Sequence, residues 1–177
     1  MVFKIINKCK TLYYKVKYKT TLKIENKIIF PKNTEIFINN GNIEIGKNFG
    51  AGSGLRLAAV RGGEIFIADN VAFNYSVRMV AHKSIFVGEG CSLGPNVMIY
   101  DHDHDYDGKS FSRQEFKVSP VVIEKNCWIG ANSIILRGAH IGEGCIVGAG
   151  TIVKGTIPPH SLVTNNRELK VISINKD

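Results

Sequence analysis

Large apolar residues recur at every sixth position in the second half of the chain. The unbroken series consists of six β-branched residues: Ile123, Ile129, Ile135, Ile141, Val147 and Val153. Four residues after each of the first five stands a small side chain, at Cys127, Ser133, Ala139, Cys145 and Thr151. A period of six matches neither the turn of an α-helix, at about 3.6 residues, nor the two-residue alternation of a plain strand. It predicts a solenoid whose short strands each turn one apolar side chain into a narrow interior.

The register continues toward the N-terminus in groups of three, separated by short insertions. These groups are Val87, Leu93 and Ile99; Ile67, Phe73 and Met79; Ile45, Ala51 and Leu57; and, more weakly, Ile24, Phe30 and Ile36. Three steps of six residues make one three-sided coil, so we predict an all-β fold, a parallel β-helix of about six triangular coils. Glycine and asparagine, which both tolerate positive φ, are frequent between the strands and suit the turns.

The register contains one long break. Between Ile99 and Ile123 it skips 24 residues, which predicts a loop over about 100–122 that leaves the solenoid and returns to it. Segments that protrude from a rigid scaffold commonly carry function. This one opens with DHDHDYD at residues 101–107, and imidazole and carboxylate groups are the usual general acids and bases of enzymes.

The N-terminal segment differs in charge from the rest of the chain. Residues 1–33 hold nine lysines and one glutamate, and so account for the whole formal net charge of +8. Apolar residues recur there at the helical spacing of three and four, at Ile5, Ile6, Cys9, Leu12, Tyr13 and Val16. We expect a short helical or strand cap over residues 1–23. Its apolar stripe either covers the end of the core, which we favour because repeat folds need terminal caps, or meets anionic lipid or an acidic partner.

Composition limits the classes of protein that fit. An apolar content of 44% and a charged content of 21% describe a soluble globular chain, and no apolar run approaches the ~20 residues that span a bilayer. Lysines interrupt the N-terminus where a signal peptide is apolar, so we expect a cytoplasmic protein. The cysteines form no CxxC motif and are expected to be reduced. Arginines and aromatic residues are not interleaved along a groove-sized surface, so nucleic acid is not expected as a partner.

Repeats of the form Ile/Leu/Val-Gly-x-x-small-x run through most of the chain, which resembles the hexapeptide-repeat acyltransferases. VGEGCSLGPNVMIY, VVIEKNCWIGANSIIL and IGEGCIVGAGTIVKGTIPP, all within residues 87–159, are similar to the maltose, galactoside and capsular-sugar O-acetyltransferase branch. The resemblance covers about residues 40–172. It implies that the β-helix, which the register places over 24–157, is left-handed and that its loop at 100–122 is catalytic; residues 158–177 are expected to form a C-terminal extension. It also implies acetyl-CoA as cosubstrate, no required metal, and a homotrimer with active sites between adjacent chains.

The resemblance further implies roles for single residues. Counted from the Asn-Val of PNVMIY, the family's general base falls on His104, and Asn74 in FNYS matches the region of its transition-state asparagine. Trp128 matches the tryptophan beside the thioester. The other donor-binding positions are Ala131, Ala149 and Lys154 along the pantetheine arm, with Lys170 or its rival Arg167 as a phosphate contact. For the acceptor, neighbouring coils offer Ser76, Arg78 and His82.

The chemistry of acetyl transfer explains why a histidine is needed. An alcohol attacks a thioester readily only as its proton is removed, and a neutral imidazole can accept that proton near pH 7. A flanking carboxylate can fix the imidazole tautomer. Asp101, Asp103 and Asp105 are candidates, although alternation in an extended segment turns Asp103 away. Backbone N–H groups or Asn74 can stabilise the oxyanion.

The predicted function is therefore that of an acetyl-CoA-dependent O-acetyltransferase acting on a sugar hydroxyl, with a surface-polysaccharide or glycan intermediate as the first candidate acceptor. A sugar N-acetyltransferase on the same scaffold and a non-catalytic scaffold are alternatives. A metal enzyme of the γ-carbonic-anhydrase kind is a third, because DHDHD offers many ligands. However, His82, His102 and His104 do not reproduce the spacing of that family.

Overall fold

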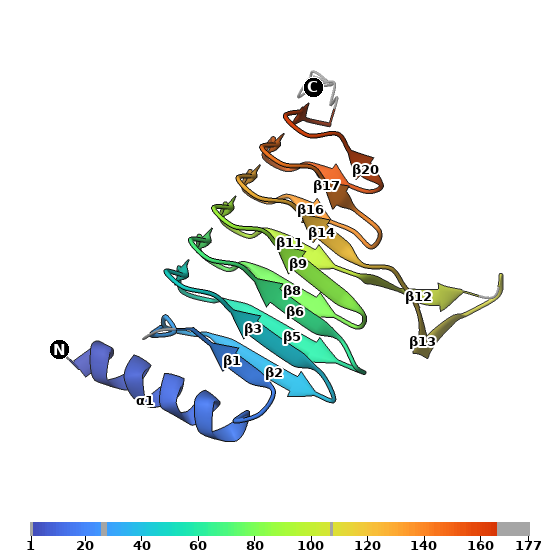
Figure 1. The fold of residues 1–177 in the computed structure, drawn as a ribbon. Helices are drawn as coiled ribbons and strands as arrows, with labels where there is room; N and C mark the ends of the chain where they lie inside the picture. The colour runs from blue at the N-terminus through green and yellow to red at the C-terminus, as the bar shows by residue number, and fades with distance from the viewer. Residues whose placement is uncertain (1, 26–27, 107, 166–177) are drawn as a thin grey trace, which may run out of the picture.

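The computed structural model describes residues 2–25, 28–106 and 108–165. The strands wind into a three-sided solenoid, and the one helix of the described residues lies across its N-terminal end (Figure 1). Each side of the solenoid is a parallel sheet in which neighbouring strands come from successive coils. From β3 onward the chain passes from the first side to the second and then to the third in every coil.

The three sides have the following strands. The first side consists of β1 (Leu22–Ile24), β3 (Asn42–Ile45), β6 (Glu64–Ile67), β9 (Ser84–Val87), β14 (Val121–Ile123), β17 (His140–Ile141) and β20 (Thr156–Ile157). The second side consists of β4 (Gly50–Ala51), β7 (Ala72–Phe73), β10 (Ser92–Leu93), β15 (Trp128–Ile129), β18 (Ile146–Val147) and β21 (Leu162–Val163). The third side consists of β2 (Glu35–Asn39), β5 (Arg56–Val60), β8 (Arg78–Ala81), β11 (Met98–Tyr100), β16 (Ile134–Ile135) and β19 (Ile152–Val153).

The six-residue register forms the core of the solenoid. All six members of the unbroken series are buried, with exposed fractions of at most 2%. They pair in register with the preceding coil: Val87 with Ile123, Leu93 with Ile129 and Ile99 with Ile135. The small residues four positions later are buried as well, because close-packed coils leave no space there for a longer side chain. The predicted parallel β-helix is confirmed.

Asparagines occupy many corners of the solenoid. Asn48, Asn70, Asn96, Asn126 and Asn132 have φ between 56° and 60°, a region that asparagine tolerates better than most residues. Their side chains also join successive coils, since Asn48 Nδ2 donates to Asn70 Oδ1 at 2.9 Å and Asn96 Nδ2 donates to Asn132 Oδ1 at 3.1 Å. The expected turn chemistry is therefore present.

The helix α1 (Val2–Lys17) confirms the predicted cap. Its inner face carries Thr11 and Tyr14, followed by Tyr18 just beyond its last turn, and all three are 6–8% exposed. Tyr14 Oη donates to the carbonyl oxygen of Thr34 at 3.0 Å, and Thr11 Oγ1 accepts a hydrogen bond from the N–H of Phe30 at 2.9 Å. These hydroxyl groups satisfy backbone atoms of the first coil, which has no preceding coil to pair with.

The predicted orientation of the apolar stripe is wrong. The five large side chains of the stripe are 53–70% exposed, and Cys9 is exposed too. The stripe therefore faces away from the core that it was expected to cover. The reason is that the open end of a coil presents backbone N–H and C=O groups, which a face bearing hydroxyls can satisfy and an aliphatic face cannot. No helix among the described residues is long and apolar enough to cross a bilayer.

Candidate active site

The long break in the register forms a β-hairpin. After β11 the chain runs out through β12 (His102–Tyr106) and returns through β13 (Phe111–Val118) to β14. The hairpin therefore projects from the corner where the third side meets the first (Figure 1). The predicted excursion from the solenoid is confirmed. It forms an antiparallel pair, with a shift in register between His104 and Tyr106, because both segments are extended and can pair their backbones.

His104 lies on the outgoing strand of the hairpin with its ring exposed. Its Nδ1 is 2.8 Å from the carbonyl oxygen of Ser112. A carbonyl can only accept a hydrogen bond, so Nδ1 carries the proton in this contact, and in the neutral ring Nε2 keeps its lone pair. The ring packs beside Phe116 and Phe111, with centroid distances of 4.7 and 5.8 Å. This arrangement leaves Nε2 as the ring nitrogen that can accept a proton.

The three candidate carboxylates have other partners. Asp103 forms an ion pair with Arg137, consistent with the expectation that it points away from His104. Asp105 forms an ion pair with Lys117 at 2.8 Å. Asp101 is buried in the solenoid. The role foreseen for a carboxylate beside His104 is thus taken by a backbone carbonyl, which fixes the same tautomer without placing a negative charge beside the ring.

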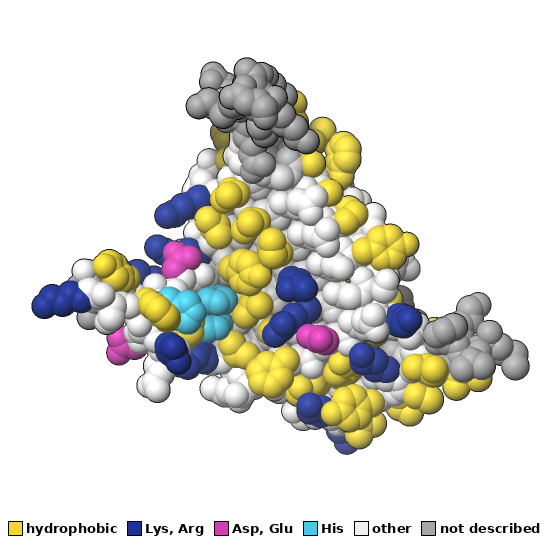
Figure 2. Space-filling model, turned by 180° about the vertical axis from the view of Figure 1, so that it is seen from behind, with side chains coloured by type: hydrophobic (Ala, Val, Ile, Leu, Met, Phe, Trp, Pro, Cys, Tyr) yellow, Lys and Arg dark blue, Asp and Glu magenta, His cyan; other side chains and the backbone are white. Residues whose placement is uncertain are grey.

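Asp101 anchors the base of the hairpin. Its side chain is fully buried and accepts hydrogen bonds from the backbone N–H of His82 at 2.8 Å and of Lys83 at 2.6 Å. It also lies 3.1 Å from His102 Nδ1. The rings of His102 and His82 stack with their centroids 3.7 Å apart, and the ring of Phe116 packs against both in a T-shaped arrangement. Figure 2 shows these histidines gathered where the hairpin joins the body.

Sequence reasoning missed this cluster. The signal was present, because Asp101 directly follows a core strand and is the first carboxylate of the hairpin.

His82, expected as an acceptor ligand, is a half-buried member of the cluster. Burial, and then the neighbouring His102, lower the pKa of His82 to about 4. Its Nδ1 has no hydrogen-bond partner among the described residues. The neutral His82 ring therefore packs against the hairpin.

A second set of expected residues lies on the second side of the solenoid. Trp128 on β15 is 57% exposed and shares a shallow hollow with Asn74, Tyr75, Ser92 and Gly94. Asn74 Oδ1 accepts a hydrogen bond from the N–H of Tyr75 at 2.8 Å, which fixes the orientation of the amide. The structure thus brings Trp128 and Asn74 together, although they are 54 positions apart in the sequence.

Ala131 and Ala149 follow this side on successive coils. Glycines precede both of them, and a Cβ on Gly130 would lie 2.6 Å from the backbone nitrogen of Ala149. Glycine is therefore required for the coils to approach this closely. Ala131 and Ala149 thus lie at adjacent levels of the solenoid, just past the paired strands β15 and β18.

The remaining expected residues lie elsewhere. Ser76 is in a turn, with φ of 58°, and Arg78 is exposed on β8. Lys154 follows β19, at the corner between the third and first sides, and so does not join the column of Ala131 and Ala149. Lys170 and Arg167 lie outside the described residues.

His104 and Trp128 of the same chain lie far apart. The hairpin leaves the corner between the third and first sides, whereas Trp128 projects from the second side. In a triangular solenoid that corner is opposite that side, so the body of the protein separates the two residues. A site that uses both therefore needs a second copy of the chain.

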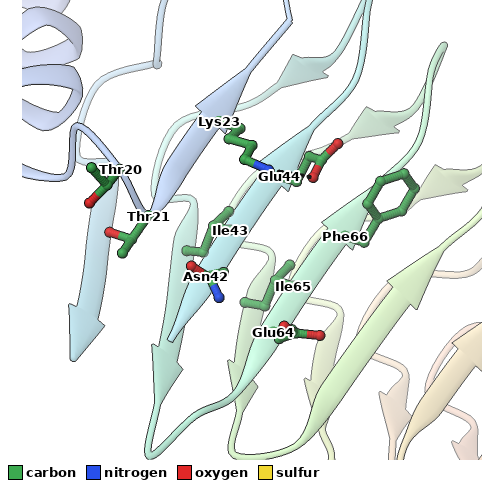
Figure 3. A pocket seen from close by; sticks show the side chains of 9 residues that line it. All are labelled: Thr20, Thr21, Lys23, Asn42, Ile43, Glu44, Glu64, Ile65 and Phe66. Atoms are coloured by element: carbon green, nitrogen blue, oxygen red, sulfur yellow. Dashed lines mark ion pairs between the residues drawn. The ribbon is translucent and has the colours of Figure 1, made fainter. Parts of the chain in front are cut away.

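A further hollow lies on the first side, near the N-terminal end (Figure 3). Lys23 and Glu44 on its wall form an ion pair at 4.0 Å. It contains none of the expected site residues. Within residues 2–25, 28–106 and 108–165, no three His, Cys, Asp or Glu side chains are grouped so that they could hold a metal ion.

Comparison with known proteins supports the resemblance seen in the sequence. Residues 120–154 match the family model described as the hexapeptide repeat of succinyl-transferase. The chain is 36% identical over 138 residues to WbbJ of Escherichia coli strain K12, which is named as a lipopolysaccharide biosynthesis O-acetyl transferase. That match covers 71% of this chain and 68% of WbbJ. The chain spans about half the length of other curated relatives that it matches, 45–49% of each.

Solved structures agree with the fold. AntD, an N-acyltransferase from Bacillus cereus in complex with dTDP and 3-hydroxybutyryl-CoA, is similar with a TM-score of 0.71 at 21% identity, over 86% of this chain and 83% of AntD. A maltose O-acetyltransferase from Clostridium difficile 630 is similar with a TM-score of 0.53 at 27% identity, over 88% of this chain and 68% of that one. Together with the repeat and the match to WbbJ, these findings confirm the resemblance: the chain belongs to the hexapeptide-repeat acyltransferase family.

Proposed function

We propose that this protein is an acetyl-CoA-dependent O-acetyltransferase that acetylates a sugar hydroxyl, with His104 as the general base. Membership of the family and the match to a relative named as an O-acetyl transferase support the reaction class. The observation that carries the role of His104 is the contact of its Nδ1 with the Ser112 carbonyl. A histidine held in this way has its basic nitrogen directed away from the hairpin backbone.

The proposed reaction is direct transfer in one site. The Nε2 atom of His104 removes the proton from the acceptor hydroxyl as the oxygen attacks the thioester carbonyl carbon, and a C–O bond forms. The tetrahedral oxyanion then collapses and the C–S bond breaks. The imidazolium returns the proton to the departing thiolate, so that coenzyme A leaves as the thiol. Such proton transfer typically contributes ~10²–10⁴ in rate.

The second side of a neighbouring copy supplies the donor site in this proposal. The exposed Trp128 ring offers a flat apolar surface beside the thioester, and the extended pantetheine arm would run across the coils past Ala131 and Ala149. Asn74, which lines the same hollow, would donate its amide N–H to the oxyanion. We assign the functional unit as a homotrimer, because a closed ring of three-sided solenoids sets a corner of each copy against a side of the next.

The proposed acceptor is a glycan or surface-polysaccharide intermediate, as the name of WbbJ suggests for that relative. We place the reaction in the cytoplasm, where acetyl-CoA is supplied. The three buried cysteines, Cys91, Cys127 and Cys145, are free thiols and are consistent with a reducing compartment.

A screen for coenzyme A release tests the proposal. The wild-type protein is incubated with acetyl-CoA and a panel of sugars, sugar nucleotides, lipid-linked glycans and amino sugars, and free thiol is measured. We expect release that depends on a hydroxyl acceptor and falls at least ~10²-fold in His104→Ala, with the affinity for acetyl-CoA nearly unchanged. His140→Ala is the matched control, since His140 is an exposed histidine on β17 outside the hairpin. Full activity of His104→Ala rules out the mechanism, and release only with amino sugars rules out O-acetylation.

A further inference from the structure

Helix α1 has two opposite faces. Thr11 and Tyr14 on one face pack against the end of the solenoid. The other face carries the outer stripe, defined as Ile5, Ile6, Cys9, Leu12, Tyr13 and Val16. Leu12 is 63% exposed and Val16 is 70% exposed. Ile28 and Ile29 adjoin Leu12 in a shallow hollow and extend the apolar surface beyond the helix.

Lysines border the outer stripe along both of its edges. At about 100° per residue, Lys8 and Lys15 lie along one edge, and Lys10 and Lys17 along the other. Lys17 Nζ lies over the rings of both Tyr13 and Tyr18, at 5.6 and 4.9 Å from their centroids, and so at the boundary between the stripe and the inner face. Residues 1–24 contain seven lysines and no acidic residue. Figure 2 shows hydrophobic and basic side chains next to one another along this end of the molecule.

The apolar stripe and the lysines beside it together favour one kind of binding partner for this face of α1. An acidic protein surface would neutralise the lysines, but it would cover the isoleucine, leucine and valine side chains only if it also carried an apolar groove of matching length. A second copy of the helix could cover the stripe, but it would bring lysines against lysines. The surface of an anionic bilayer satisfies both features, because the stripe enters the acyl boundary while the lysines contact the headgroups.

We propose that α1 docks this protein on the surface of an anionic lipid bilayer, with the outer stripe buried in the interface. Because α1 closes one end of the solenoid (Figure 1), the coils would stand away from the membrane and the catalytic hairpin would lie above it. An acceptor on a lipid carrier would then meet the hairpin at a fixed height. The docking itself does not depend on the acetyl-transfer proposal.

Vesicle co-sedimentation of the full chain tests the docking. Vesicles of phosphatidylcholine alone are compared with vesicles that contain about 30% phosphatidylglycerol. We expect at least about tenfold stronger binding to the anionic vesicles, weakened when salt is raised from about 0.1 M to about 0.5 M, since screening shortens the reach of the lysines.

Paired variants separate the two contributions. Leu12→Gln with Val16→Gln removes apolar groups without changing charge, and we expect binding to fall at least about tenfold. Lys8→Gln with Lys15→Gln should weaken binding by about fivefold per lysine.

The apolar control is Leu162→Gln with Ile152→Gln, which changes side chains that are 72% and 50% exposed at the far end of the solenoid. The charge control is Lys47→Gln with Lys83→Gln, and both controls should bind as wild type does.

Several results would overturn the docking proposal. These are equal binding to both kinds of vesicle, no binding to either, or wild-type binding by the Leu12→Gln and Val16→Gln variant. A change in oligomer size of that variant without lipid would show instead that the stripe contacts a second copy. Circular dichroism and thermal melting confirm that each variant is folded. Acetyl transfer to a water-soluble acceptor should be unchanged in the stripe variant, so failure of docking and failure of the transferase proposal are distinguishable.

Discussion

The two hairpin histidines differ in the atoms that hold their rings. The Nδ1 atom of His104 contacts a backbone carbonyl at an exposed position, whereas that of His102 lies beside the buried carboxylate of Asp101, with the ring stacked on His82. The first arrangement leaves a ring that can meet substrate. The second fixes the base of the hairpin, so in our proposal Asp101 and His102 are positioning residues that support the strand carrying His104.

Replacement of Asp101 tests this anchoring role. In Asp101→Asn, one acceptor oxygen becomes an NH₂ group that faces backbone donors, so we expect a loss of about 1–3 kcal/mol in the free energy of unfolding. Urea denaturation measures the loss, and kcat should fall while the KM for acetyl-CoA changes little. Asp69→Asn is the matched control, because Asp69 accepts a backbone hydrogen bond at an exposed position. Equal stability of Asp101→Asn and wild type would refute the role.

His82 predicts a dependence of stability on pH. Because the fold lowers its pKa from 6.5 to about 4, the unfolded chain binds a proton between these values that the folded chain does not. Acid therefore favours unfolding. The free energy of unfolding is not reduced by His82 above pH 6.5, and it decreases as the pH falls from 6.5 toward 4. Between pH 7 and 5 we expect His82→Gln to lose about 1 kcal/mol less than wild type, after allowance for partial exposure. Urea midpoints at both pH values measure the difference, and parallel losses would contradict it.

The strands of the solenoid divide sharply into inward and outward positions. Ile135 on β16 is buried, whereas Ile152 on the adjacent β19 is 50% exposed. We expect Ile135→Ala to cost about 2–4 kcal/mol in urea denaturation, through lost burial and the cavity left behind. Ile152→Ala should cost less than about 1 kcal/mol, because its side chain is already half in water. Similar costs for both would contradict the assignment of the core.

The elements differ in how far the sequence predicts them. The buried positions from Ile123 to Val153 are predictable, because a period of six residues fits a three-sided solenoid and fits neither an α-helix nor a plain strand. The inward face of α1 is not, since periodicity located the aliphatic stripe but not the hydroxyl groups that the open coil needs. The contact between His104 and Ser112 is also hidden, because it depends on a hairpin whose register shifts between His104 and Tyr106.

At the scale of the whole molecule, the expected active-site residues fall into two groups. His104 belongs to the hairpin at one corner, and Trp128 and Asn74 belong to the hollow on the opposite side. The sequence gives the order of these residues along the chain. It does not show in which directions the hairpin and the Trp128 side chain project from the solenoid. The solenoid geometry supplies these directions, and with them the reason why a site that uses both His104 and Trp128 needs a second copy.

Coexpression of His104→Ala and Trp128→Ala chains tests this shared site most directly. In randomly mixed assemblies, about a quarter of the sites would join an intact His104 from one copy to an intact Trp128 from the next. At subsaturating acetyl-CoA, we predict acetyl transfer near a quarter of the wild-type rate, well above either variant alone. A mixture no more active than the mean of the two variants assayed apart would contradict the account.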